Sequence, residues 1–239
     1  MSTFAWISIF AIAAAIINAF GILSILKHRK WVEKAKTYLM CFAAGVLIST
    51  PLIFAFPQAI KKNFYAGFAA LIGFLFMFLS NEFIKKRAKQ KELAFGVTAV
   101  EGIGIHSFVD GIVYAVTFST SIFIGIVSGV GLVIHEFAEG VITFSVLIKA
   151  GVEKKKATLY ALIVSSLTTP LGAFIAYPFV SKLNDSVLGL ALGFMVGALI
   201  YTSAAHLLPE AREYEKKHSV LAFIAGVVLS LIIVFTKMI

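Results

Sequence analysis

The sequence predicts an all-α, polytopic membrane protein with eight transmembrane helices. Its 239 residues are 60% hydrophobic and only 14% charged, whereas the apolar share of a soluble globular domain is nearer half. Apolar runs of about 20 residues, which can cross a hydrocarbon core roughly 30 Å thick, recur between short polar breaks. Because little chain lies outside these runs, we expect one transmembrane domain over residues 1–239 and no separate soluble domain.

The apolar runs and the basic residues together predict the topology. We place the helices at approximately 4–26, 37–57, 64–84, 94–118, 121–148, 157–180, 186–209 and 218–238. The breaks after the first, third, fifth and seventh runs hold 17 of the 21 Lys and Arg residues. Cytoplasmic loops carry such an excess, so we expect a cell-membrane protein whose two termini are both extracytoplasmic.

The same charge pattern excludes some classes of protein. The net charge of +9 arises from these short breaks, so it indicates a membrane surface and not nucleic acid. No basic residue precedes the first run and a basic cluster follows it, which predicts a retained helix instead of a cleaved signal peptide. The single Cys41 excludes an intrachain disulfide and a multi-cysteine zinc motif.

Polar residues within the predicted helices predict local features of the bundle. Asn18, in the first helix, is expected to make an interhelical hydrogen bond. Helix 157–180 carries several hydroxyl residues followed by Pro170, which predicts a kink whose freed carbonyls bond those hydroxyls. Thr169 in this segment and Ser107 in helix 94–118 could line an ion path, although packing alone would also explain the hydroxyl segment.

Helix 37–57 and helix 186–209 resemble each other. A shift of 152 residues gives seven identities in eighteen positions, including Gly45 with Gly197 and Pro57 with Pro209. The two helices are expected to run in opposite directions, so the halves of the chain would be related by inversion. Three helices, a central pair and three more helices in inverted repeats are typical of transporters with a midplane site.

Two short stretches in the central pair suggest a metal site. They read Gly104-Ile105-His106-Ser107-Phe108-Val109-Asp110-Gly111 and, 29 residues later, Val133-Ile134-His135-Glu136-Phe137-Ala138-Glu139-Gly140. Each places a histidine and a carboxylate four residues apart, on one face of a helix. The uncharged turn at 118–121 makes the two helices antiparallel neighbours, so these faces should meet at similar depth.

The carboxylates of Asp110, Glu136 and Glu139 need positive charge at this depth. Each costs about 2.5–3.5 kcal/mol at the bilayer centre, and no Lys or Arg is expected nearby. Either a divalent ion or protons on the carboxyl groups could supply the charge, and the adjacent histidines favour the ion. We assign His106, Asp110, His135 and Glu139 as primary ligands. Two nitrogens and two oxygens suit Zn²⁺, our first choice, or Fe²⁺, Mn²⁺, Co²⁺ or Cd²⁺, and disfavour Cu⁺.

Four further acidic or histidine residues have secondary candidate roles. Glu136 points about 100° away from His135 around the helix and could hold a second ion, bridge to it by water, or receive protons released on binding. Glu101 could face a water-filled exit or only reach toward the interface. His206 and Glu210, one turn apart, could form a weaker cytoplasmic exit relay or an interfacial pair without a metal role.

At these motifs the sequence resembles the ZIP (Zrt/Irt-like) family of divalent-metal transporters. His106 to Gly111 is similar to the family pattern His-Asn-x-x-Asp/Glu-Gly, and His135 to Gly140 is similar to His-Glu/Asn-x-Pro-Glu-Gly. The ending His206-Leu207-Leu208-Pro209-Glu210-Ala211 is also similar to the family's. The resemblance implies metal import into the cytoplasm, an elevator movement of helices one, four, five and six, and frequent homodimers. The metal would be transported cargo, with no permanent cofactor.

Three departures from the family pattern bear on the number of ions. Ser107 replaces the usual Asn, Ala138 replaces the usual Pro, and Thr169 stands where some members place a metal-binding Glu. Members with a two-metal centre use that Asn and that Glu for the second ion. The resemblance therefore implies one metal per protomer in this chain.

Three other functions were weighed against metal transport. An intramembrane metal-dependent hydrolase would need a second histidine where Glu139 stands in the His-Glu-x-x-His pattern, so we do not expect an enzyme. A non-selective cation or proton channel would bind no metal in particular. A metal sensor is disfavoured by the inverted repeat and by the absence of a signalling domain in this sequence.

Overall fold

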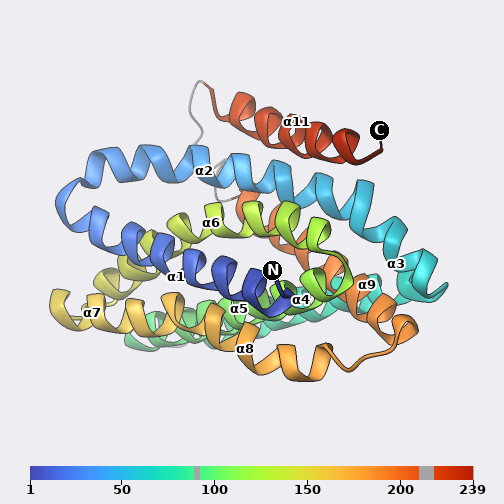
Figure 1. Ribbon diagram of the computed structural model, residues 1–239. Coiled ribbons are helices and arrows are strands. Elements are labelled where there is room, and N and C mark those ends of the chain that lie inside the picture. The colour runs from blue at the N-terminus through green and yellow to red at the C-terminus, as the bar shows by residue number, and fades with distance from the viewer. Residues whose placement is uncertain (89–91, 210–217, 239) are drawn as a thin grey trace.

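The computed structural model describes residues 1–88, 92–209 and 218–238, and these residues form helices and turns with no strand. The helices are α1 (Thr3–Lys27), α2 (Arg29–Thr50), α3 (Phe56–Lys62), α4 (Ala66–Ala88), α5 (Glu92–Thr120), α6 (Ile122–Lys149), α7 (Lys154–Ala161), α8 (Thr168–Val180), α9 (Asp185–Tyr201) and α11 (Ser219–Met238). Three π-helical turns, Pro51–Ala55, Leu162–Ser166 and Thr202–Leu207, interrupt or extend them. The prediction of an all-helical protein is confirmed (Figure 1).

Seven helical stretches of the described chain are long and apolar enough to cross a membrane. They are Thr3–Lys27, Arg29–Lys62, Ala66–Phe83, Ile103–Thr120, Ile122–Ile148, Lys154–Val180 and Asp185–Ala205. α11 provides a shorter apolar stretch, Ser219–Ile232, at the eighth predicted position. α2 begins at Arg29, eight residues before its apolar run, because good helix formers such as Lys and Ala extend the helix past the apolar part.

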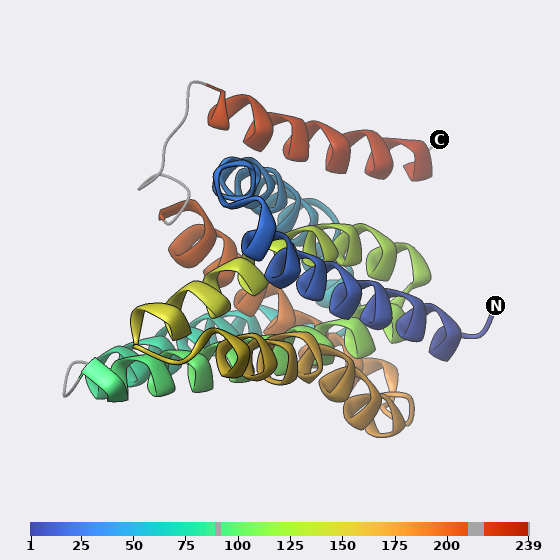
Figure 2. The same ribbon diagram turned by 90° about the vertical axis from the view of Figure 1, so that its left-hand side faces the viewer.

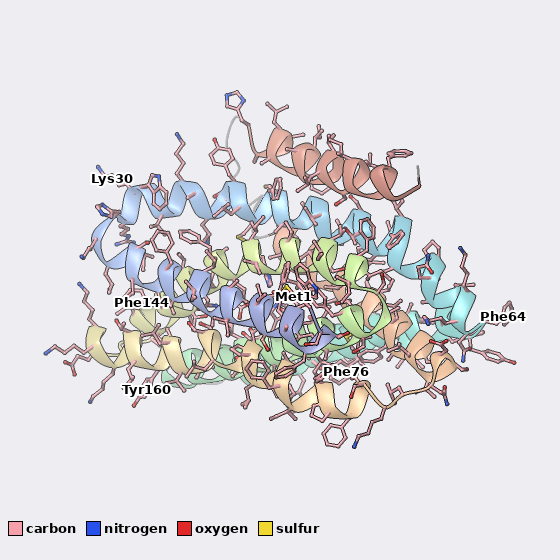
Figure 3. All side chains as sticks on the ribbon, in the orientation of Figure 1. Met1, Lys30, Phe64, Phe76, Phe144 and Tyr160 are labelled. Carbon is pink, nitrogen blue, oxygen red and sulfur yellow. The ribbon has the colours of Figure 1, made fainter. Side chains whose placement is uncertain are left out.

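The turns between the helices fall at two opposite ends of the bundle. The joint between α1 and α2 and the turn between α6 and α7 lie at one end, here called the basic end because it carries Lys27, Arg29, Lys30 and Lys154–Lys156 (Figures 1 and 2). Both termini, α3 and the turn between α8 and α9 lie at the other, the terminal end. Lys30 and Phe64 mark the two ends in Figure 3. The charge asymmetry along the sequence is therefore an asymmetry in space.

The exterior of the bundle is apolar and its interior contains polar groups. Large side chains along α1 and α4 are exposed, among them Ile16, Phe20, Phe68, Ile72 and Leu79. The buried polar set is Asn18, Ser107, Asp110, His135, Glu136, Glu139, Ser165, Ser166 and Thr169, together with other hydroxyl residues. A water-soluble protein has the opposite distribution, with its charges outside. This is an integral membrane protein.

α5 and α6 lie side by side in the middle of the bundle, and α5 packs tightly against α8. A Cβ on Gly111 would stand only 2.1 Å from the carbonyl oxygen of Thr169, and one on Gly172 only 2.2 Å from that of Phe108. Real Cβ atoms do not approach carbonyl oxygens so closely, so this crossing requires glycine on both helices.

α6 packs against α1 in the same way. A Cβ on Gly140 would stand 2.3 Å from the carbonyl oxygen of Asn18, and one on Gly21 would stand 2.3 Å from that of Phe137. Phe137 and Gly140 follow His135 by two and five residues, as Phe108 and Gly111 follow His106. The two motif helices are therefore fixed to their outer neighbours by equivalent crossings.

The helices that resemble each other in sequence also share a local irregularity. The π-helical turn Pro51–Ala55 extends α2, and the π-helical turn Thr202–Leu207 extends α9. A shift of 152 residues carries the first turn onto residues 203–207. The matching glycines Gly45 and Gly197 each lie against a backbone carbonyl, of α11 and of α4 respectively. Pro51 lacks an N–H group, which accounts for the irregular turn in α2.

Candidate metal site

Four side chains from α5 and α6 meet at one point inside the bundle. His106 and Asp110 come from α5, and His135 and Glu139 come from α6. One ligand atom of each lies within 4.8 Å of all the others. Both helices present these residues four apart, so each helix contributes one turn of a single face. The two faces point toward each other, as the motifs predicted.

The separations of these atoms suit one small divalent ion. The Nε2 atom of His135 lies 3.1 Å from Asp110 Oδ2 and 3.6 Å from Glu139 Oε2, and the Nε2 atom of His106 lies 3.4 Å and 3.8 Å from the same oxygens. Ligands at zinc–nitrogen and zinc–oxygen distances of about 2.0–2.1 Å stand roughly 3.3 Å apart in a tetrahedron. The four groups are therefore already spaced close to the separation that such an ion requires.

The ring of His135 is held with its Nε2 atom presented to the cluster. Its Nδ1 atom hydrogen-bonds the carbonyl oxygen of Leu132. A carbonyl oxygen can only accept, so Nδ1 carries a hydrogen, and in the neutral ring Nε2 presents its lone pair. Nε2 has no hydrogen-bond partner among the described residues. An outer hydrogen bond of this kind orients histidine for metal binding in many proteins.

Glu139 is oriented by a side chain of the neighbouring helix. The hydroxyl of Ser107 donates to Oε1 of Glu139, while Oε2, the atom turned toward the histidines, accepts no hydrogen bond from the described residues. The side chains of His135, Asp110 and Glu139 are 1%, 3% and 8% exposed, whereas that of His106 is 15% exposed. His106 is therefore the most accessible of the four candidate ligands.

Glu136 belongs to a separate hydrogen-bond network on the flank of the cluster. Asn18 donates through Nδ2 to one carboxylate oxygen at 2.7 Å, and Thr169 donates to the other at 2.8 Å. Glu136 is fully buried, and it is absent from the group of four ligand atoms. Its two donors come from α1 and α8, the helices that pack against the motif pair.

The network continues from Asn18 to the π-helical turn before α8. The side-chain oxygen of Asn18 accepts hydrogen bonds from Ser165 and Ser166, at 2.8 and 2.9 Å. The predicted interhelical hydrogen bond of Asn18 is thus confirmed. The sequence did not reveal that its partner is Glu136, since the pairing joins residues 118 positions apart.

The remaining predicted site residues fall partly outside the described structure. Ser107 and Thr169, predicted to line the path, contact the carboxylates of Glu139 and Glu136 respectively. The backbones of Glu101 and His206 are described but their side chains are not, and Glu210 lies outside the described residues. Their roles at a cytoplasmic exit stay predictions.

Comparison with protein families identifies the chain. The model of the ZIP zinc transporter family matches residues 91–234, which is more than half of the sequence and includes both motifs. The chain belongs to the ZIP zinc transporter family. Its four-residue cluster is therefore formed by the segment that the family model matches.

Several individual proteins resemble this ZIP family member. The zinc transporter ZupT of Chlorobium chlorochromatii is 26% identical over 246 residues, covering 90% of this chain and 91% of that protein. ZupT of Clostridium perfringens is 38% identical over 79 residues, covering 32% and 27%. The zinc transporter ZIP9-B of Xenopus laevis is 28% identical over 162 residues, covering 61% and 52%. The chain thus aligns with less than two thirds of the Clostridium and Xenopus proteins and with nearly all of the Chlorobium protein.

Proposed function

We propose that this protein carries a divalent metal ion across the membrane, with Zn²⁺ as its first substrate, through the cluster of His106, Asp110, His135 and Glu139. The observation that carries the proposal is the spacing of their four ligand atoms, which fits a tetrahedral zinc site. Membership in the ZIP family and the names of its zinc-transporting relatives support the choice of metal. The same donor set also suits Fe²⁺, Mn²⁺, Co²⁺ and Cd²⁺.

We propose that each protomer holds one ion at the cluster. Both oxygens of Glu136 already accept hydrogen bonds, from Asn18 and from Thr169. Ser107, next to His106, donates its hydroxyl to Glu139 and is fully buried. A second ion beside the first would have to share these oxygens with the donors that they already bond. These hydrogen bonds favour a structural role for Glu136, which joins α1 and α8 to α6, over a role as a metal ligand.

We propose that the ion moves from the terminal end toward the basic end, which faces the cytoplasm. The basic residues at the joint of α1 and α2 and at the start of α7 support this orientation. Exit would pass Glu101, His206 and Glu210, the last of which lies outside the described residues. Both termini would then be extracytoplasmic, and the protein would reside in the cell membrane, where it could form a homodimer.

The helix packing supports an elevator movement and a 3+2+3 arrangement. The glycine–carbonyl crossings described above join α1 with α6 and α5 with α8, the motif helices α5 and α6 lie side by side, and other such crossings join α2 with α11 and α4 with α9. Between the two sets the contact is different, since Gly131 of α6 faces only the side chains of Leu47 and Val46 on α2. Side-chain contacts slide more readily than interlocked backbones, so the first set could move against the second.

An intramembrane hydrolase is a poorer fit to the same site. The general base in a His-Glu-x-x-His site is the Glu beside the first histidine, here Glu136. Its oxygens are occupied by hydrogen bonds on the flank, and Glu139 stands where the second histidine would be. Four protein ligands also fill a tetrahedral site and leave no position for a reactive water.

The test is zinc uptake into proteoliposomes that contain the purified protein. We expect saturable uptake by the wild type and none by His106→Ala or Glu139→Ala, with both variants inserted normally. His218→Ala removes an exposed histidine outside the cluster and serves as the control. Wild-type uptake by either cluster variant would refute the site.

Competition by other metals at two pH values would identify the substrate and separate a channel from a carrier. Histidine nitrogens and carboxylates must lose their protons to bind metal, so zinc binding should weaken as the pH falls. We expect Cd²⁺ to compete well and Mg²⁺ poorly, since Mg²⁺ prefers oxygen ligands in octahedral geometry. Equal inhibition by all divalent ions would indicate a non-selective channel.

A further inference from the structure

Three buried hydroxyls outside the four-residue cluster lack a hydrogen-bond partner within the described residues, those of Tyr114, Ser119 and Ser128. All three lie on α5 and α6, between the cluster and the terminal end. Buried polar groups in proteins are nearly always paired, so each exception requires an explanation. Tyr114 and Ser128 are both 0% exposed, and we call them the outer hydroxyl pair.

The outer hydroxyl pair lies at one level of the bundle. Tyr114 follows His106 by eight residues on α5, which places its Cα about 12 Å farther toward the terminal end. Ser128 precedes His135 by seven residues on the antiparallel α6, which is roughly 10 Å in the same direction. Seven residues are two helical turns, so Ser128 lies on the face of α6 that carries His135.

The phenol of Tyr114 reaches back toward the cluster. Aromatic side chains on helices lean toward the N-terminus and cover the preceding turn, which on α5 contains Asp110. The hydroxyl lies within electrostatic range of the carboxylates of Asp110, Glu136 and Glu139. It therefore lies between the cluster and the terminal end of the bundle.

One aromatic ring lies against Tyr114 and against the residue that follows Ser128. Phe10 of α1 packs against the ring of Tyr114, with centroids 6.2 Å apart, and against Phe118 at 5.1 Å. The same Phe10 ring lies against Gly129, where a Cβ would stand 2.5 Å from it. Tyr114 and the helical turn that contains Ser128 and Gly129 therefore both border the ring of Phe10.

The hydroxyl of Ser128 differs from those of its neighbours on the same two helices. Thr117, Thr120 and Thr143 each donate to the backbone carbonyl four residues earlier, as hydroxyls in membrane helices commonly do. Ser128 makes no such bond. Alanine at 128 and phenylalanine at 114 would fill the same space without burying an unpaired oxygen. The two unpaired oxygens therefore need a reason other than packing.

We propose that Tyr114 and Ser128 form an outer station for a hydrated divalent cation, through which the ion reaches the four-residue cluster from the terminal end. The inference rests on the proposed function. When Phe10 and Phe118 move aside, the hydroxyl oxygens accept hydrogen bonds from the water shell of the ion. Both groups are neutral, so they hold the ion weakly and release it to the carboxylates below. Partial dehydration begins at this station.

The test compares the rate of loading with the affinity of the cluster. Tyr114→Phe, Ser128→Ala and the double variant should keep the wild-type zinc dissociation constant at equilibrium in detergent. At low zinc concentration, the initial uptake rate of the double variant should fall by about three- to tenfold. This is the effect of losing one or two ordinary hydrogen bonds in the transition state for ion entry. Zinc association measured by stopped flow should slow by the same factor, and so should dissociation.

Tyr201→Phe is the matched control, because Tyr201 is a buried tyrosine whose hydroxyl accepts a hydrogen bond from Asn81 away from this path. It should leave uptake unchanged. Wild-type rates in the double variant would overturn the proposal, and so would a loss of equilibrium affinity equal to the loss of rate. If Tyr114→Phe fails to fold, Ser128→Ala alone decides by the same comparison. A wild-type protein that takes up no zinc would overturn the proposed function itself.

Discussion

The two motifs, one centred on His106 and one on His135, are arranged alike beside their outer helices but carry different residues directly after the histidine. Each motif places a carboxylate four residues after its histidine and a glycine five residues after it, and each glycine meets a carbonyl of an outer helix. The carbonyl belongs to Thr169 on one side and to Asn18 on the other. The residue after the histidine is Ser107 in the first motif and Glu136 in the second.

The difference at the position after the histidine separates two roles. Ser107 orients a candidate ligand, and Glu136 joins the outer helices to the centre. The side chains of Thr169 and Asn18, which occupy equivalent places beside the two motifs, both donate to Glu136. The Glu136 carboxylate is thus held between α1 and α8, while the hydroxyl of Ser107 turns inward to Glu139. The second motif therefore carries a buried carboxylate, that of Glu136, which joins the outer helices α1 and α8 to α6.

The largest expected effect comes from removing the histidines, and it should be unequal. His135→Ala deletes the more buried ring, which Leu132 orients, whereas His106→Ala deletes the more exposed one. Both should lower zinc affinity by more than the roughly 10- to 100-fold that loss of an outer partner costs, with His135→Ala the more severe. Isothermal titration of zinc measures the ranking. Equal losses would show that the ring orientation does not matter.

Next in size is the effect of adding a methyl group at the two equivalent crossings. Gly111→Ala and Gly140→Ala each force a Cβ against a carbonyl oxygen, so both should destabilise the protein by about 1–3 kcal/mol, as overpacking commonly does. Thermal unfolding in detergent is the measurement. Gly67→Ala, where a Cβ would make only ordinary contacts at 3.9 Å or more, is the matched control. Tolerance at one crossing alone would break the equivalence of the two motifs.

A smaller effect should follow from cutting the bonds to Glu136. Asn18→Ala removes the donor to Glu136, the acceptor of Ser166 and one of two acceptors of Ser165, so it should cost about 1.5–3 kcal/mol, the worth of a hydrogen bond to a charged group. Thr169→Val removes one donor and no other contact, so it should cost less. The unfolding temperatures of the two variants give the order. We expect the bond from Asn18 of α1 to stabilise the protein more than the bond from Thr169 of α8. A larger drop in unfolding temperature for Thr169→Val would contradict this.

The smallest effects are expected at the position after each histidine. Glu136→Gln keeps the shape but places an amide N–H₂ against one of two donors, so transport should weaken a few-fold without being lost. Ser107→Ala removes one outer hydrogen bond of Glu139 and should lower zinc affinity by about tenfold or less. Uptake assays on both variants, with metal counted per protomer, provide the check. Complete loss in Glu136→Gln would point to direct metal binding by that residue.

The sequence was sufficient for the helices and for the composition of the cluster, because both depend on local spacing. Apolar runs of membrane length give the spans, and a four-residue interval places His106 with Asp110 and His135 with Glu139 on single faces. The start of α2 was not predictable in this way. Helix propensity continued the helix into the basic segment, where the hydropathy pattern gave no signal.

Contacts between distant residues were beyond the reach of the sequence. Periodicity placed Glu136 on the flank of the site but gave no means of pairing it with Asn18 or Thr169. Nor did it show that the hydroxyl of Tyr114 is buried without a partner among the described residues, since an aromatic residue in a membrane helix is ordinary packing in most cases. Such pairings depend on how helices cross, and crossings are set by the shapes of both partners.

The amino-acid sequence alone determined which groups could bind an ion and that they lie within a membrane, since residue type and helical period suffice for both. Only the tertiary structure decided that the carboxylate on the flank, Glu136, is bonded by two outer helices and so braces the bundle. The physical reason is that a carboxylate with free oxygens differs from one with two bonded donors only in its neighbours. Here those neighbours come from helices far away in the chain.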